Sequence, residues 1–366
     1  MPKPILAGAL ALLLAACASA PPVPAGGPAA ASPAPVPTPA RIAEAWVSPA
    51  MPGEELDSVV TWTSADGATW LLATAKSSHR LVLLDGETGG LSGTVGSRGE
   101  AAGAFDRPNG LAVFGDVLFV VERDNRRVQL LSLPEFAPLA SFGNDELRSP
   151  YGIWLHERAP GELEVFVTDS FMYGERHDVV PPAEELAQRI RRYRLRFDDQ
   201  GHPDAAYLGA FGETAGPARL DRVESIAGDP LHARLMVAEE DAGSSTLHVY
   251  GFDGRWSGRS LPAGTFAGEA EGVLLWTCGT DGGYWLAVDQ RKPLTAFHLF
   301  HRDSLAPAGS FHGTVTSNTD GATLHAAATP RFPGGVLYAV HDDRAVAAFD
   351  LRDVVEALGL DPGCLR

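Results

Sequence analysis

The chain has 366 residues, with 46 Asp and Glu against 29 Lys and Arg, and its formal net charge is −17 at pH 7. A surface this acidic repels nucleic acid and anionic lipid, so we expect no nucleic-acid binding and an affinity for cations or for partners that carry them. Beyond the N-terminal segment, the length allows one buried core, and all-β chains of this size remain a single domain.

The N-terminus has the pattern of a bacterial export signal. Residues 1–16 carry Lys3 followed by an apolar stretch that is too short to span a bilayer but has the length of a secretory hydrophobic region. The stretch ends in Leu-Ala-Ala-Cys17, which resembles a lipobox, so we expect cleavage before Cys17 and lipidation of its thiol. An ordinary signal peptide cut near Ala20 is the alternative. Ala18 differs from the aspartate of an inner-membrane retention signal, so we expect an outer-membrane lipoprotein whose lipid is its sole membrane attachment.

The next segment, residues 17–41, consists almost wholly of Pro, Ala, Gly, Ser and Val after its cysteine. This composition cannot bury a core and favours extended chain. We therefore expect a tether here, followed by a globular domain over residues 42–366 that is a monomer.

Six units of similar pattern follow along the globular part. Each begins with a short polar-then-apolar run, and these openings recur about every 50 residues, which indicates a repeated supersecondary unit. The openings begin at Asp57, Asn109, Tyr151, Glu224, Glu271 and Asp320. Each is followed by a run rich in Val, Leu and aromatic residues and, in most units, by a third such run, as is typical of strands. The pattern predicts an all-β fold, a six-bladed β-propeller with three or four strands per blade.

The unit that opens at Tyr151 is the longest. Residues 181–188 begin with proline and carry glutamates early, which predicts a short helical insert near residues 173–190. Residues 189–197 then alternate arginines with apolar side chains. We interpret this alternation as an edge or outer strand with a solvated face rather than as an anion site.

Carboxylates are expected to gather at one mouth of the ring. In a propeller the first strand of each blade lines the central channel, so the six opening residues meet around one axis. The ends of the second strands add Glu122, Asp169, Glu239, Glu240, Asp241, Asp289, Asp342 and Asp343. So many converging carboxylates repel one another unless hard cations lie among them, and calcium is the natural candidate. The alternative for any one aspartate is a turn residue that caps the backbone, and we prefer it for Asp85, Asp253 and Asp350.

Basic residues are few, and several stand beside the carboxylates. They are Lys76, Arg123, Arg126, Arg291 and Lys292. Carboxylates, cations and bases at one mouth suit a phosphorylated ligand. Surface ion pairing is the alternative interpretation.

Cys278 and Cys364 remain as an even pair in an oxidising compartment. Cys278 lies at the inner end of the fifth unit, and Cys364 lies past the last predicted strand. A disulfide between them would pin the C-terminal tail to the ring. Two separate thiols are equally open, because the sequence gives no distance.

Several stretches resemble the β-propeller phytases. Residues 223–241 end in Leu-Met-Val-Ala-Glu-Glu-Asp241 and are similar to that family's segment that runs from Thr-Glu-Gly to Leu-Tyr-Ile-Ala-Glu-Glu-Asp. The resemblance extends over roughly residues 57–351 and implies the same six-bladed fold. Further landmarks of the family are resembled by residues 56–62, 73–76, 107–109, 271–272, 317–321 and 336–343.

The resemblance implies hydrolysis of phosphomonoesters of phytate, myo-inositol hexakisphosphate, with several calcium ions that bind phosphate and activate water. The catalytic candidates that it implies are Glu224, Glu271, Asp320 and Tyr151. The calcium-ligand candidates are Asp57, Glu224, Glu239, Glu271, Asp320 and Asp342. The candidates for phosphate contacts are Lys76, Arg123, Arg126 and Lys292. Such chemistry needs no protein nucleophile, because metals and bases neutralise the phosphoryl oxygens.

The chain also departs from the phytase pattern. Leu56, Ser77, Asn318 and Ser225 stand where acids, a lysine or a glycine are usual, so we expect fewer or weaker calcium sites. Residues 107–113 and 123–128 moreover resemble the NHL repeat of binding propellers. The alternative function is therefore a noncatalytic propeller that binds a ligand or an envelope protein.

Overall fold

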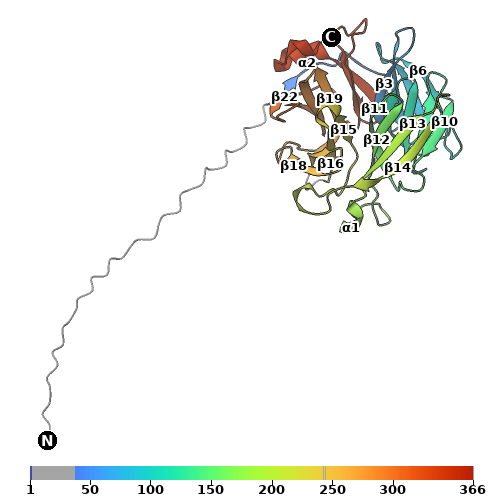
Figure 1. Cartoon of the computed structure of the whole chain (residues 1–366). Helices are drawn as coiled ribbons and strands as arrows, with labels where there is room; N and C mark the ends of the chain where they lie inside the picture. Colours follow the sequence, from blue (N-terminus) through green and yellow to red (C-terminus); the bar gives the residue numbers. More distant parts are fainter. Residues whose placement is uncertain (2–37, 242, 244, 366) are drawn as a thin grey trace. The chain divides into compact units, whose positions relative to one another are not determined.

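The structure, a computed structural model, describes Met1 and residues 38–365 apart from 242 and 244 (Figure 1). The predicted leader, the lipidation site Cys17 and most of the predicted tether lie outside these residues. Within the described residues, no helix is both long and apolar enough to cross a membrane.

The described chain folds into six sheets, five of four strands and one of five, with the strands in sequence order or nearly so. The innermost strands are β3 (Leu56–Thr63), β7 (Pro108–Phe114), β11 (Pro150–Ala159), β15 (Ile226–Asp229), β19 (Glu269–Cys278) and β23 (Ala322–His325). The second strands are β4 (Thr69–Ala75), β8 (Val117–Glu122), β12 (Glu162–Asp169), β16 (Arg234–Glu239), β20 (Gly282–Gln290) and β24 (Val336–His341). The third strands are β5 (Arg80–Asp85), β9 (Arg127–Ser132), β13 (Ile190–Phe197), β17 (Thr246–Gly251), β21 (Ala296–His301) and β25 (Ala345–Asp350). The outer strands are β6 (Leu91–Val95), β10 (Pro138–Phe142), β14 (Pro203–Phe211), β18 (Trp256–Ser260), β22 (Pro307–His312) and, in the sixth sheet, β2 (Trp46–Val47).

The six sheets form a closed ring. Each innermost strand contacts the innermost strand of the next sheet, and β23 contacts β3. Apolar clusters fill the space between neighbouring sheets; one of them joins Trp276 and Leu286 of the fifth sheet to Leu337 and Phe349 of the sixth. The predicted six-bladed β-propeller is thus confirmed, and every blade has a fourth strand.

The N-terminal residues of the domain close the ring. β2 supplies the outer strand of the last sheet, where Trp46 pairs with Ala348 of β25. β1 (Ala40–Arg41) adds a parallel fifth strand to β22 of the fifth sheet. The ordered domain therefore includes Ala40 and Arg41, just before the expected start at residue 42.

Glu44, between these two strands, anchors the N-terminal segment to the sixth blade's entry loop. Its carboxylate accepts backbone N–H groups of Thr314, Val315 and Thr316 at 2.9–3.0 Å, together with the hydroxyls of both threonines. Burial alone would raise the pKa of Glu44, but these hydrogen bonds outweigh it and lower the pKa to about 2.

Glu44→Gln is expected to destabilise the protein by about 1–3 kcal/mol at pH 7, because an amide cannot accept all of these donors. A depressed carboxyl pKa stabilises the fold above the unfolded pKa and loses that effect as the pH falls toward the folded value. The difference between wild type and variant should therefore shrink between about pH 4.5 and pH 2. Urea unfolding across this range measures it, and a difference independent of pH would contradict the assignment.

The C-terminal tail is fastened to the fifth blade. α2 (Leu351–Leu358) follows β25 and packs beside β22 (Figure 1). Beyond it, Cys364 in the short helix η3 (Pro362–Cys364) forms a disulfide with Cys278 at the end of β19. Of the two possibilities left open by the sequence, the structure shows the bonded pair.

The insert of the third blade contains α1 (Ala183–Leu186), a single helical turn. The strand that follows differs from its prediction, because β13 lies between β12 and β14 and is neither an edge nor an outer strand. Its arginines alternate because β12 beside it is acidic: Arg191 pairs with Asp169, Arg192 with Glu164 and Arg196 with Glu162. The alternation thus reflects ion pairs within the blade rather than a solvated face.

Candidate cation and phosphate site

The innermost strands share an irregularity at the opening residues. Each opening residue and the residue after it form a pair that interrupts regular strand pairing. In β3, β7, β11 and β19 the register with the second strand shifts across this pair, and in β15 and β23 the hydrogen-bonded strand begins directly after it. The pairs are Asp57-Ser58, Asn109-Gly110, Tyr151-Gly152, Glu271-Gly272, Glu224-Ser225 and Asp320-Gly321. A bulge of this kind redirects a side chain out of the regular alternation of a strand. All of these residues except Asn109 line a central channel of about 510 Å³.

Glycine at the second position of four of these pairs lets neighbouring strands come close. A Cβ atom on Gly152 would lie 2.1 Å from the carbonyl oxygen of Glu224, and one on Gly321 would lie 2.3 Å from that of Asp57. The side chains that precede the glycines are therefore drawn together around the mouth.

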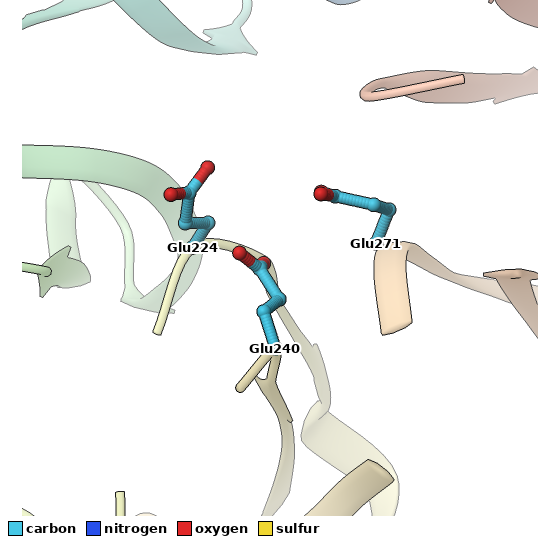
Figure 2. Close-up of side chains that lie close together, drawn as sticks. All are labelled: Glu224, Glu240 and Glu271. Atoms are coloured by element: carbon cyan, nitrogen blue, oxygen red, sulfur yellow. The ribbon is translucent and has the colours of Figure 1, made fainter. Parts of the chain in front are cut away.

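Three carboxylates meet at this mouth. One oxygen each of Glu224, Glu240 and Glu271 lies within 4.8 Å of the others. Figure 2 shows Glu271 reaching from the fifth blade toward Glu224 and Glu240 of the fourth. The Oε1 atom of Glu240 is buried and has no hydrogen-bond partner in the described structure. Among the described residues, no Lys, Arg or His forms a salt bridge with any of the three carboxylates, while Lys76 and Arg222 offset the charge of Glu224 from farther away.

The pKa values of these groups reflect this excess of negative charge. Burial, followed by the charge of Asp57, raises the pKa of Glu224 to about 7. Burial and the charge of Glu224 raise the pKa values of Glu240 and Glu271. Burial, again with Asp57 next in importance, raises the pKa of Asp320 to about 8. A bound cation would favour the ionised form of every one of these carboxyls.

The metal-free protein should consequently lose stability as the pH rises from about 5 to 8. A folded-state pKa above the unfolded value means that the folded protein binds more protons over this window, so each step upward in pH favours unfolding. Urea unfolding in the presence of a chelator measures the trend, and Glu224→Gln should flatten it. A rise in stability over the same window would contradict the assignment.

The donor set fits a hard cation. The converging atoms are all carboxylate oxygens, the ligands that calcium prefers, and the triad contains neither imidazole nor thiolate. The Oε1 atom of Glu240 has no hydrogen-bond partner and is free to bind a cation. These residues could hold Ca²⁺, with Asp57 and Asp320 close enough to raise the pKa of Glu271.

Basic side chains occupy the other part of the mouth. The Lys76 Nζ atom lies 3.2 Å from Asp57 and 3.8 Å from Glu55. Burial would lower the pKa of Lys76, but the carboxylates of Asp57, Asp320 and Glu224 outweigh it and raise the pKa. Arg107 pairs with Glu55 at 2.6 Å. The first and second blades thus contribute cationic groups, whereas the first, fourth, fifth and sixth blades contribute carboxylates.

Tyr151 lies between the two parts of the mouth. Burial and the charge of Glu224 raise the pKa of Tyr151 to about 12, while Arg123, which hydrogen-bonds its hydroxyl, acts in the opposite direction. The Tyr151 hydroxyl therefore stays protonated at neutral pH. Of the predicted site residues, the structure brings together Asp57, Lys76, Arg123, Tyr151, Glu224, Glu271 and Asp320.

Glu239 was predicted as a calcium ligand, and the structure gives it another role. Its carboxylate accepts backbone N–H groups of Asp221 at 2.6 Å, Arg222 at 3.2 Å and Asp241 at 2.9 Å. The adjacent Glu240 joins the triad instead, because successive side chains of a strand point to opposite sides. The predicted ligand and the carboxylate found in the triad thus differ by one residue.

The role of Glu239 recurs at the ends of other second strands. Asp169, Asp289 and Glu122 accept backbone N–H groups of Ser149 at 2.7 Å, Gly268 at 2.8 Å and Asp106 at 3.1 Å. In the sixth blade the Nδ1 atom of His341 accepts the N–H of Ser317. In each case the acceptor ties the loop that enters an innermost strand to the second strand of the same blade.

Asp342, Lys292 and Arg126 do not join the triad. Asp342 pairs with Arg344 and with Lys292, whose Nζ atom lies 3.3 Å away. Arg126 is exposed at a turn with φ of 52°. Burial and Asp57 raise the pKa of Asp320 most, and Asp343, the neighbour of Asp342, raises it further. At Asp342 as at Glu239, the carboxylate nearer the other acids of the mouth belongs to the next residue along the chain.

Other residues of the mouth carried no prediction. Gln290 donates an amide N–H to Asp320. Glu269 lies near enough to raise the pKa values of Glu224, Glu240 and Glu271. Gln290 directly follows Asp289, whose carboxylate binds the entry loop. The residue after each such loop-binding acid was therefore the sequence signal that could have identified Gln290.

The ring of six sheets and the charged mouth of its channel define the class: a six-bladed β-propeller with a candidate cation site. No family model matches the chain, and no curated protein matches it either. Among solved structures it is similar to hydrazine synthase of Kuenenia stuttgartiensis, with 13% identity, a TM-score of 0.46, and coverage of 93% of this chain and 84% of that one. It is also similar to a chain of a nidogen/laminin complex, with 15% identity, a TM-score of 0.47, and coverage of 75% and 87%. At these values the similarities carry no argument about function.

Proposed function

We propose that this protein is a calcium-dependent phosphomonoester hydrolase that acts on inositol phosphates such as phytate. The observation that carries the proposal is the convergence of Glu224, Glu240 and Glu271, with one buried and unpartnered oxygen, beside the fixed cation Lys76. A hard cation and a buried ammonium group at one mouth are suited to holding a phosphoryl group from two sides.

The acidic and basic residues of the mouth have different roles in this proposal. Glu224, Glu240 and Glu271 would hold calcium, with Asp57 and Asp320 completing the acidic side. Calcium, when bound, supplies neutralisation of phosphoryl charge and activation of water. Lys76 and Arg123 contact phosphoryl oxygens from the basic side, and the protonated hydroxyl of Tyr151 donates a hydrogen bond between the two sides. No protein nucleophile is required for this chemistry.

The test is phosphate release from calcium phytate by the purified protein, with and without chelator. We expect release that chelator abolishes. Glu224→Gln should abolish release, whereas Asp342→Asn, which changes a carboxylate outside the triad, should retain it. Calcium binding without release of phosphate from any phosphoester would contradict the hydrolase proposal.

A noncatalytic calcium-binding propeller is the second candidate, and two observations favour it. Leu56, where the resembled family has an acid, is fully buried in the apolar core and offers no ligand. Asn318, another such position, donates its amide N–H to Asp343 at 3.0 Å. Recovery of a stable ligand or envelope partner together with calcium binding, and without hydrolysis, would support this function.

We further propose that the protein is a monomeric lipoprotein of the outer membrane, attached through Cys17. The support is the leader and lipobox-like run alone. Mass spectrometry of the mature N-terminus tests it, since Cys17→Ser should abolish the lipid mass and release the protein from the membrane fraction.

A further inference from the structure

The chain segment that carries Glu224 is held in place by its own fourth blade and by the neighbouring third blade. We propose that Arg189, at the end of the insert between β12 and β13, is a positioning residue that holds residues 220–225 so that Glu224 lies at the mouth. The inference rests on the proposed cation site, because Glu224 is one of its ligands.

The guanidinium of Arg189 spans two loops. It is fully buried and donates to carbonyl oxygens of Asp169 at 3.1 Å and Phe171 at 2.7 Å, both at the start of the insert. From its other side it donates to the carbonyl oxygens of Leu220 at 3.3 Å and of Asp221. One side chain therefore joins the insert of the third blade to the segment that leads to Glu224.

This arrangement is costly for the fold. Burial lowers the pKa of Arg189 to about 10, so the side chain remains charged at neutral pH. Among the described residues no carboxylate lies within 4.0 Å of it, and backbone carbonyls take the place of an ion pair. A buried charge of this kind is a poor source of stability compared with an apolar side chain. Its benefit is directional, because the planar fork fixes the positions of several carbonyl groups at once.

The rest of the segment is fixed in the same way. The Ser170 hydroxyl accepts the N–H of Val223 at 3.1 Å, and the Thr168 hydroxyl donates to the carbonyl of Glu224 at 2.7 Å. Both residues belong to the third blade, as does Arg189. The capping carboxylate of Glu239 and the N–H of Glu240 bind the segment from the fourth blade. Glu224 precedes the fourth blade's first strand, yet the third blade sets much of its backbone position.

The test compares Arg189→Lys with a matched control, Arg302→Lys. Arg302 is also a buried arginine, but it pairs with Asp229 at the far end of β15 from Glu224. Hydrogen–deuterium exchange in the presence of chelator measures how firmly residues 220–225 are held. Calorimetric titration with Ca²⁺ measures the calcium affinity of the site. Arg189→Lys should speed exchange of this segment about tenfold and weaken calcium affinity about tenfold, the effect typical of groups that orient metal ligands. Arg302→Lys should lower the melting temperature about as much as Arg189→Lys does, but it should leave the exchange rate of residues 220–225 and the calcium affinity unchanged.

The possible outcomes distinguish the positioning role of Arg189 from the proposed cation site. Wild-type exchange rates and wild-type affinity in Arg189→Lys would overturn the positioning role. If the wild-type protein binds no calcium, the proposed cation site fails, while the exchange comparison still decides the role of Arg189. If Arg189→Lys does not fold, Arg189→Gln decides instead, because a neutral amide keeps hydrogen-bond donors without an unpaired buried charge and cannot span both loops. Exchange of residues 220–225 at the wild-type rate in Arg189→Gln would then overturn the proposal.

Discussion

Glu240→Gln is expected to make the metal-free protein more stable and to abolish its stabilisation by calcium. Glu240 lies buried beside Glu224 and Glu271 with one oxygen unpartnered, and burial together with those charges raises its pKa. Removing the charge should gain on the order of 1–3 kcal/mol at pH 7 in chelator, because a buried and uncompensated group is then removed. The new amide can also donate to either neighbouring carboxylate.

The adjacent Glu239→Gln is the matched control with the opposite result. Its carboxylate accepts three backbone N–H groups, so the variant should lose about 1–3 kcal/mol while calcium continues to stabilise it. Thermal and urea unfolding with calcium or chelator distinguish the pair. If Glu240→Gln proved less stable than wild type in chelator and still gained stability from calcium, Glu240 would not be a ligand.

Lys76→Met is expected to lower kcat/KM for phosphate release by about 10²–10³, the loss typical of a fixed group that stabilises developing charge. It should also destabilise the fold by about 3–5 kcal/mol, because Asp57 would lose its partner at 3.2 Å in a buried setting. Calcium should recover part of that stability by taking over the charge of Asp57.

Arg80→Met is the control for Lys76. Arg80 belongs to the same blade and pairs with Glu54, but its side chain is 37% exposed against 15% for Lys76, which lies near Asp57, Asp320 and Glu224. Steady-state kinetics of both variants, with unfolding measured alongside, should show a large loss in Lys76→Met alone. Equal activity of Lys76→Met and wild type would exclude this lysine from phosphate binding.

The repeat was readable from the sequence because each blade presents the same physical pattern. Short Val- and Leu-rich runs alternate with turn residues, and the polar openings stand at one phase of every unit, so Asp57, Glu224, Glu271 and Asp320 could be placed at one mouth in advance. The short pairings of β1 and β2 carry no such signal, because two residues are too few for a periodicity.

The differences between prediction and structure have a common physical origin. Whether Glu239 or Glu240 lies beside Glu224 and Glu271 depends on where β16 stops alternating, and the sequence does not mark that point. In the sixth blade both Asp342 and Asp343 adopt left-handed backbone conformations, with φ of 49° and 59°, which breaks the alternation. The arginines of β13 were assigned to a solvated face because their acidic partners lie on another strand, β12, whose register is invisible in the sequence.

Ring closure by β2 has a consequence for the order of events during synthesis. The strand that completes the sixth blade is made at the start of the domain, and its partner Ala348 is made near the end, so the pairing must wait for almost the whole chain. Contacts between residues this far apart in sequence are slow to form. The acidic side of the mouth draws on the first, fourth, fifth and sixth blades, and a nascent chain therefore cannot assemble a complete site. Any activity begins only after the first and last segments of the domain have met.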